Sequence, residues 1–289
     1  MVAKSSISGS PTGSPRQKVM SVITISRGSF SGGKTLAECL SKRLGYRCID
    51  RDVIVERAAA SGVTQEELLN ALLKPPSFLE RFQHKRYVYL TLIQAALAEE
   101  VKTGRVVYHG NAGHLLLRGA GPVLRVRIIA PVEFRVAMIH DRSKLDRGEA
   151  LAYIQRVDQE RRRWTQFLYG VNWEDPALYD VVLNLEHIGI EEACEMLAAV
   201  VRRQKCFEFT SDCQAAMADL ALASRVRASL ALASSTSHLE VEVTAKGGQV
   251  RIKGKIAAVN ELEDVRRVVA HIPGVEEFNL DELVSPVAH

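Results

Sequence analysis

The stretch "ITISRGSFSGGKTLAE", Ile23 to Glu38, decides the fold of this 289-residue chain. Residues that favour β-structure lead directly into small, flexible ones, and a helical pattern begins at Gly33-Lys34-Thr35. The segment contains Gly28-x-x-x-x-Gly33-Lys34-Thr35, the complete phosphate-loop (P-loop) pattern, with the strand before it and the helix after it that the pattern requires. This context predicts a loop that holds a nucleoside triphosphate rather than an ordinary tight turn.

Each residue type in this loop has its own chemical purpose. Glycines let backbone N–H groups approach phosphate oxygens, and the start of the helix directs its positive dipole end at the same place. Lys34 is expected to supply a point charge for the β- and γ-phosphates, and the Thr35 hydroxyl to ligate Mg²⁺. The predicted cofactors are therefore ATP and Mg²⁺, and the predicted binding residues are Gly28, Ser31, Gly32, Gly33, Lys34 and Thr35.

Beyond this loop, short apolar strands alternate with helical patterns. The predicted strands cover about residues 19–26, 46–50, 105–110, 123–130 and 180–185. Five such strands indicate an α/β fold with a parallel sheet and helices on both faces. The chain then changes character: a helix precedes two alternating segments around Gly247-Gly248, which predict a hairpin, and a helix and a strand follow.

Composition supports a division of the chain into unequal parts. Residues 1–18 are rich in Ser, Gly and Pro and are predicted to be a disordered tail. Residues 19–204 form the predicted α/β domain, and residues 205–289 form a small α+β domain that includes its leading helix. From Gln204 to His289 there are 9 Lys and Arg against 12 Asp and Glu, so the excess of positive charge lies in the first part, as suits an anionic ligand.

The bulk numbers also exclude some classes of protein. The formal net charge of +4 is too modest to indicate a nucleic-acid partner. Neither an apolar signal segment nor a CxxC pair is present, and five cysteines are expected to be reduced thiols, so we predict a cytoplasmic protein.

The segments "ITISRGSFSGGKTLAECLSKRLGYRCIDRDVI", "YIQRVDQERRRW" and "NWEDPALYDVVLNLEHIGIEEA" resemble the cytidylate kinase-like family. The resemblance covers about residues 20–203, and the C-terminal part resembles a BON domain through "VRIKGKI" and "IPGVEEF". This likeness implies a P-loop kinase fold and phosphoryl transfer from ATP to a nucleoside monophosphate, with CMP or dCMP the first candidate.

The same resemblance suggests roles for residues of the basic helix at 147–163. Arg156, Asp158 and Arg161 match the family's Arg-x-Asp-x-x-Arg spacing, and this region resembles a lid whose tip is the segment 164–170. Asp158 is expected to hold one arginine of its own helix while others face outward. Lys34, Arg156, Asp158 and Arg161 are thus the predicted catalytic residues; the alternative for the helix is a solvated basic face.

For the acceptor site, the sequence leaves alternative roles open for several residues. Asp50 is either an acceptor-site or Mg²⁺-shell acid or the N-cap of the next helix, with Arg51 and Asp52 as secondary candidates. Arg27 contacts a phosphate or pairs with a surface acid. Where the family has Gly-Arg this chain has Gly110-Asn111, so His109, His114 or a neighbouring Arg replaces the charge, or the acceptor is not cytidylate.

Two other interpretations stay open. In one, the protein is a nucleotide-binding regulator with weak or no kinase turnover, and its BON-like domain contacts a membrane surface or a protein partner. In the other, it is a kinase for a hydroxyl compound that is not a nucleotide.

Overall fold

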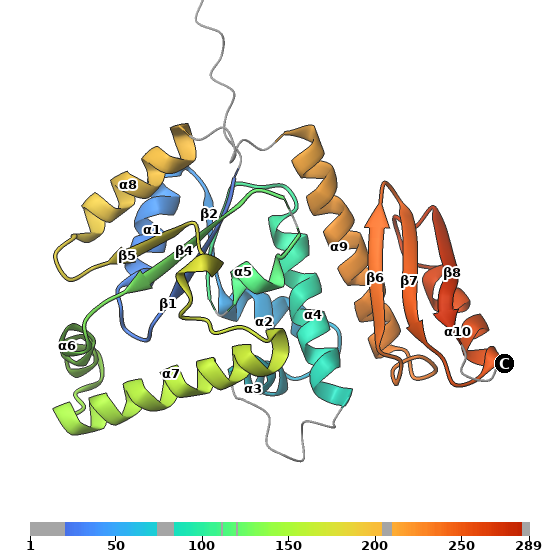
Figure 1. Cartoon of the computed structure of the whole chain (residues 1–289), viewed down its shortest axis with the longest axis horizontal. Helices are drawn as coiled ribbons and strands as arrows, with labels where there is room; N and C mark the ends of the chain where they lie inside the picture. Colours follow the sequence, from blue (N-terminus) through green and yellow to red (C-terminus); the bar gives the residue numbers. More distant parts are fainter. Residues whose placement is uncertain (1–20, 74–83, 111, 120, 204–209, 285–289) are drawn as a thin grey trace, which may run out of the picture.

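The computed structural model of the chain describes residues 21–73, 84–110, 112–119, 121–203 and 210–284. These residues form a five-stranded sheet with its helices, followed by a three-stranded sheet with its own helices (Figure 1). Three sequence predictions lie outside the described residues: the disordered tail over 1–18, the domain boundary between 204 and 205, and the place of Asn111.

The larger sheet is parallel throughout, as predicted, and its strand order is β2-β3-β1-β4-β5. The apolar residues of its central strand β1, Val22, Ile23 and Ile25, are at most 1% exposed, because helices cover both faces of a parallel sheet. The strands are β1 (Val22–Arg27), β2 (Arg47–Asp50), β3 (Val106–His109), β4 (Val123–Ile129) and β5 (Val181–Asn184).

Helices pack on both faces of this sheet and form two separate cores. One face is covered by α1 (Gly33–Leu44) and α8 (Ile190–Arg203), and the other by α2 (Arg51–Ala59), α3 (Gln65–Leu73), α4 (His84–Val101) and α5 (Gly113–Leu116). The hairpin of α6 (Val132–Ser143) and α7 (Arg147–Tyr169) crosses the edge where the strands end, as Figure 1 shows for α7. Helix α5 and the short 3₁₀ helix η2 (Pro176–Leu178) were not predicted from the sequence.

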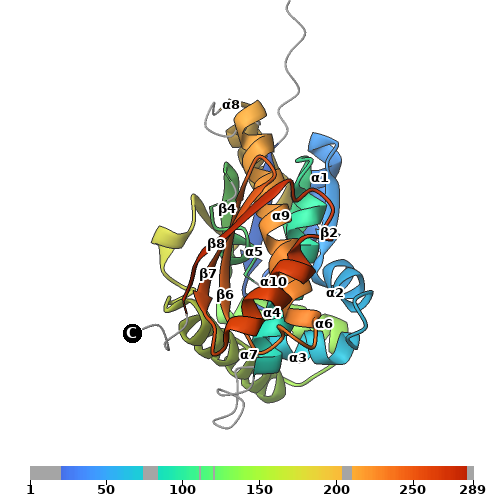
Figure 2. The ribbon, with the colours of Figure 1, turned by 90° about the vertical axis from the view of Figure 1, so that its right-hand side faces the viewer.

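The C-terminal part has the predicted order of elements. It consists of α9 (Ser211–Leu232), β6 (Val241–Lys246), β7 (Gln249–Lys255), α10 (Val259–Val269) and β8 (Glu277–Val284). Strands β6 and β7 form the expected antiparallel hairpin, with Gly247 and Gly248 both at positive φ, and β8 pairs parallel with β7. Helices α9 and α10 lie beside this sheet, as Figure 2 shows, and form a common core with it.

Helix α9 belongs to two cores at once. Leu222, Val226 and Leu230 face the three-stranded sheet, whereas Met217 and Ala228 are buried in the core formed by α2, α3 and α4. Across the same boundary, the Tyr87 hydroxyl donates a hydrogen bond to the carbonyl of Val241 at 3.0 Å. The C-terminal part therefore rests on α4 through shared apolar packing.

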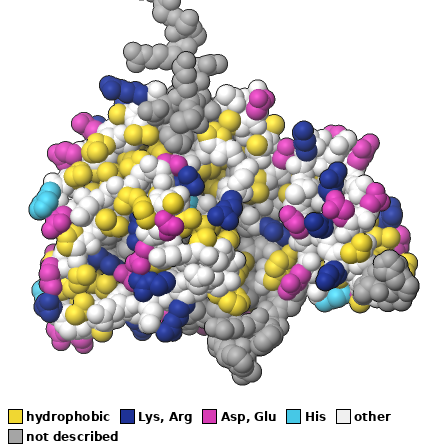
Figure 3. All heavy atoms as spheres, in the orientation of Figure 1, with side chains coloured by type: hydrophobic (Ala, Val, Ile, Leu, Met, Phe, Trp, Pro, Cys, Tyr) yellow, Lys and Arg dark blue, Asp and Glu magenta, His cyan; other side chains and the backbone are white. Residues whose placement is uncertain are grey.

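The surface carries charges of both signs, interspersed over the face seen in Figure 3. Among the described helices, we find none whose length and apolar character would let it cross a membrane.

Replacing Met217 by Ala tests whether the two cores unfold together. Met217 is 1% exposed, so the substitution removes buried methylenes and is expected to lower the free energy of unfolding by about 2–5 kcal/mol. Urea unfolding followed by circular dichroism should show a single transition shifted to lower urea. Met196→Ala, at a side chain that is 48% exposed, is the control with little effect. Two separate transitions in the wild type would contradict the shared core.

Candidate active site

The predicted P-loop lies between the end of β1 and the start of α1. Its backbone takes the left-handed conformation at Phe30 (φ 58°) and Gly32 (φ 82°), and the Ser31 hydroxyl donates to the Gly28 carbonyl at 3.0 Å. Gly33 has no room for a side chain, since a Cβ would lie 2.4 Å from Cδ of Arg27. Gly32 caps α1 without a side-chain hydrogen bond, which leaves the helix N-terminus available to an anion.

Lys34 and Thr35 are both exposed in the first turn of α1, where the pattern predicts them. The ammonium group of Lys34 lies 3.8 Å from the carboxylate of Glu38, one turn further along the helix, and both side chains are about half exposed. Exposed pairs of this kind contribute little free energy, so Lys34 is free to turn toward a phosphate.

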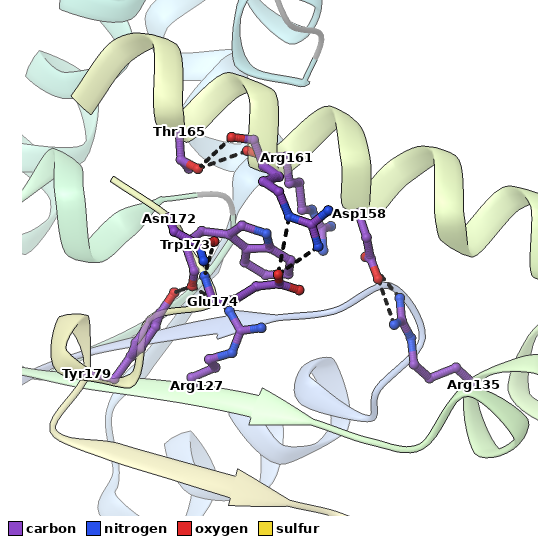
Figure 4. Close-up of polar contacts among 10 residues, drawn as sticks. Arg127, Arg135, Asp158, Arg161, Thr165, Asn172, Trp173, Glu174 and Tyr179 are labelled. Atoms are coloured by element: carbon purple, nitrogen blue, oxygen red, sulfur yellow. Dashed lines mark hydrogen bonds and ion pairs between the residues drawn. The ribbon is translucent and has the colours of Figure 1, made fainter. Parts of the chain in front are cut away.

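The ion pair of Arg135 on α6 with Asp158 on α7, which we call the brace, supports this loop. Arg135 donates to both carboxylate oxygens of Asp158, at 2.7 and 3.0 Å, and its Nε donates to the Ser29 carbonyl at 2.8 Å (Figure 4). The guanidinium carbon lies 3.2 Å from where a Cβ of Gly28 would stand, so this glycine lets the arginine approach the loop. The prediction that Asp158 pairs within its own helix is wrong: the carboxylate orients an arginine of α6.

Arg161 reaches the loop from α7. Its Nη1 donates to the Arg27 carbonyl at 2.5 Å, so these two arginines lie together. Burial, partly opposed by Asp158, lowers the pKa of Arg161 to about 10, and burial followed by the charge of Arg51 lowers the pKa of Arg27. An arginine guanidinium keeps its charge at neutral pH even when its pKa is lowered in this way.

Arg156 is not part of this group. It is exposed on α7, with its guanidinium 5.5 Å from the ring of Tyr153, because a separation of five residues places it on a different side of the helix from Arg161. The predicted lid tip is also wrong. Residues 164–169 continue α7, Trp164 is buried, and its indole N–H donates to the Ala71 carbonyl of α3 at 2.8 Å.

Sequence reasoning missed Arg127, which lies on β4. It is 7% exposed, its Nη1 donates to the Trp173 carbonyl at 2.6 Å, and its guanidinium stacks 4.2 Å from the Trp173 ring. Figure 4 shows Trp173 between the strand that carries Arg127 and the helix that carries Arg161. Neither Arg127 nor Arg135 belongs to a sequence motif, so only their burial in the structure identifies them as candidate site residues.

In the structure Asp50 takes the second of its two predicted roles, that of a helix N-cap. Its carboxylate accepts a hydrogen bond from the backbone N–H of Val53 at 3.0 Å and caps α2. Arg51 pairs with Asp52 at 2.9 Å on the surface of the same helix. His109 ends β3 in register with Asp50 and is buried, and burial lowers its pKa.

A cavity of about 20 Å³ lies beside the P-loop, among the ends of β1 and β3 and the helices α3, α5 and α7. A space of this size holds about one water molecule, so a larger ligand enters only when side chains around it move. Its wall combines apolar side chains with cationic and aromatic ones, among them Arg27, Leu72, His114, Arg161, Trp164 and Trp173.

His114 is the least satisfied polar group of this wall. It is 7% exposed, its ring stacks 4.7 Å from that of Tyr179, and neither ring nitrogen has a hydrogen-bond partner in the described part of the chain. Burial, followed by the charges of Arg125 and Arg127, lowers its pKa to about 4, so the imidazole is neutral at pH 7. The sequence had offered His114 as one of several substitutes for a missing arginine; a neutral ring is not a substitute for that charge.

Comparison with known proteins identifies the family of the chain. The model of the cytidylate kinase-like family matches residues 22–187, more than half of the chain. Cytidylate kinase from Thermococcus kodakarensis is 28% identical over 182 residues, which are 62% of this chain and 87% of that protein. Cytidylate kinase from Ignicoccus hospitalis is 29% identical over 181 residues, which are 62% of this chain and 97% of that protein.

Among solved structures, an uncharacterized protein from Eubacterium ventriosum superposes with a TM-score of 0.52 at 16% identity, over 64% of this chain and 99% of that one. The fold and the P-loop define the class: an α/β P-loop kinase-like fold with a five-stranded parallel sheet. The chain belongs to the cytidylate kinase-like family, a nucleotide-kinase family.

Replacing Asp158 by Ala tests the brace on the loop. The variant leaves Arg135 without its partner in a site where both side chains are mostly buried, at 10% and 19% exposure, and is expected to lose about 2 kcal/mol of unfolding free energy. Glu133→Ala is the control, because its pair with Arg147 is exposed on both sides. Chemical denaturation compares them, and equal losses would show that the brace is no stronger than a surface pair.

Proposed function

We propose that this protein transfers the terminal phosphoryl group of Mg-ATP to a nucleoside monophosphate, with CMP or dCMP as the acceptor. The observation that carries this proposal is the charge of the cavity. Arg27 and Arg161 line it and Arg127 stacks on its Trp173, yet in the described part of the chain none of these arginines is in an ion pair. Cations withdrawn from water without a counter-charge cost free energy, so the site favours an anionic ligand.

The two substrates would then occupy opposite sides of Arg27 and Arg161. The P-loop and the N-terminus of α1 would hold the phosphates of ATP, with Lys34 at the β- and γ-phosphates. Once side chains around it move, the cavity would hold the acceptor, with its phosphate at the two arginines and its flat base among apolar side chains such as Leu72 and Trp164. The names of the relatives support cytidylate as that acceptor.

The chemistry asked of the protein is positioning and charge stabilisation, because phosphoryl transfer needs little covalent catalysis. Arg161 lies at the boundary between loop and cavity, where negative charge is shared between donor and acceptor. Asp158 does not touch either substrate in this scheme: it positions Arg135 against the loop carbonyl of Ser29. Arg156 would contribute only if α7 moved.

Mg²⁺ would be held mainly by the nucleotide. Thr35 is exposed directly after Lys34, so its hydroxyl suits the metal ligand position. No group of three or more His, Cys, Asp or Glu side chains that could hold a metal occurs in the described ranges. This fits Mg²⁺, which commonly keeps water and phosphate oxygens as ligands and takes few from protein. The ion neutralises phosphate charge when it is bound.

A second proposal concerns the C-terminal part and the location and partners of the protein. We propose that residues 205–289 form a BON-like regulatory or interaction domain, that the protein is cytoplasmic, and that it does not bind nucleic acid. The packing of α9 on α4 supports a role that involves the kinase part, since both belong to one core. A membrane or protein partner for the exposed side of this domain is part of the second interpretation, a nucleotide-binding regulator.

Lys34→Ala tests the donor side. ADP release coupled to NADH oxidation is measured with Mg-ATP and each of CMP, dCMP, UMP and AMP. Loss of the loop cation is expected to lower kcat/KM by about 100-fold or more. Lys42→Ala, at an exposed lysine in the last turn of the same helix, is the control with unchanged rates. ATP binding without turnover on any of the four acceptors would favour the regulator, or an acceptor that is not a nucleotide.

Arg161→Ala tests the acceptor side and separates function from stability. Because burial and the charges of Arg27 and Arg135 outweigh the attraction of Asp158 for Arg161, removal of Arg161 is expected to leave the unfolding temperature unchanged or raised, while kcat/KM with CMP falls by about 100-fold. Arg163→Ala, on an exposed part of α7, should change neither quantity. A lowered unfolding temperature together with full activity would assign Arg161 a structural role only.

A further inference from the structure

Three polar atoms in the wall of the acceptor cavity have no partner. They are both ring nitrogens of His114 and the indole nitrogen of Trp173, in side chains that are 7% and 4% exposed. Buried polar groups are nearly always hydrogen-bonded, and leaving one without a partner destabilises the folded chain. The space beside these groups holds about one water molecule; when the side chains around it move, a ligand can take that place and complete the hydrogen bonds.

The surroundings of these atoms show which part of a ligand they face. The charged groups that act on these side chains are arginines: Arg127 and Arg161 lie over the Trp173 ring, and Arg127 and Arg125, the latter paired with Asp180, act on His114. A phosphate is therefore drawn to the guanidinium groups. A neutral imidazole and an indole N–H instead suit an uncharged group, because together they offer donors and one acceptor without charge.

We propose that His114 and Trp173 select the acceptor by hydrogen bonding to the polar edge of its base, and that this edge is that of a pyrimidine. This inference rests on the proposed function. The edge of a pyrimidine base carries a carbonyl oxygen next to a ring nitrogen and an amino or second carbonyl group, which matches an indole donor beside a neutral imidazole. Apolar neighbours such as Leu72 and Ala112 suit the faces of the ring.

The shielding of these atoms explains why they would discriminate between bases. Because water does not reach the three nitrogens, a base that fails to pair with them leaves them unsatisfied after binding. A base that forms hydrogen bonds with these nitrogens removes the free-energy cost that they impose on the folded chain without ligand. Because the three nitrogens are covered by other atoms, the acceptor reaches them only when side chains around the cavity move.

His114→Phe is the first test. Phenylalanine keeps a ring against Tyr179 and removes both unpartnered nitrogens, so the unfolding temperature without ligand is expected to stay the same or rise. The Kd for CMP, measured by calorimetry on the full chain, is expected to weaken by about 10- to 100-fold, with the Kd for ATP unchanged. The preference for CMP over AMP should fall by a similar factor. His140→Phe, at an exposed histidine of α6, is the matched control.

Trp173→Phe is the second test, and it applies even if His114→Phe does not fold. It removes the indole N–H together with the five-membered ring, keeps an aromatic face toward Arg127, and is expected to weaken CMP binding by about 10-fold. Unchanged CMP affinity in both variants, beside a wild type that binds CMP, overturns the inference and leaves the proposed function intact. A wild type that binds none of CMP, dCMP, UMP and AMP overturns the proposed function itself, and the inference with it.

Discussion

The site depends on one guanidinium group that joins two distant parts of the chain. Arg135 bonds at once to the Ser29 carbonyl of the P-loop and to Asp158 of α7, across 106 and 23 residues of sequence. The first bond steadies the loop, and the second fixes the rotation of α7. With α7 held in this way, Arg161 points at the loop and Trp164 reaches α3. Arg135 thus connects the P-loop to α7, the helix that contributes Arg161 and Trp164 to the cavity wall.

The second governing feature is an imbalance of charge. Asp158 is committed to Arg135, so the neighbouring Arg27, Arg127 and Arg161 share no carboxylate in the described part of the chain. Hydrogen bonds to backbone carbonyls and stacking on Trp173 stabilise them only in part. Such a site is less stable empty than filled with an anion, because the ligand supplies the missing charge. Activity and stability are therefore expected to respond in opposite directions to changes here.

The C-terminal part is connected to the same site through α4. Arg227 of α9 bonds to the side chain of Gln94, and Gln94 in turn donates to the Leu116 carbonyl of α5 at 2.8 Å. His114 lies on that short helix, and Leu72 of the cavity packs in the core that α4 and α9 share. A partner that moved α9 would thus act on the side of the cavity proposed to hold the acceptor, and not on the P-loop.

Much of the fold follows from local patterns in the sequence. The P-loop, the five apolar strands, the hairpin at Gly247-Gly248 and the alternation of helices could all be predicted, because each depends on neighbours within a few residues. The short α5 was missed, since its four residues carry no periodic pattern. The predicted roles of Lys34 and Thr35 also rest on local spacing, and the structure places both residues where the pattern requires.

The cavity beside the P-loop and its arginines, in contrast, were decided by tertiary structure alone. Spacing along α7 grouped Arg156 with Arg161 and paired Asp158 within the helix, yet the fold separates the two arginines and gives Asp158 to Arg135. Arg127 and the unpartnered His114 acquire meaning only when β4, α5 and α7 meet at one cavity. The reason is physical: a loop that binds phosphate is built from consecutive backbone groups, whereas burial and ion pairing depend on which distant residues the fold brings together.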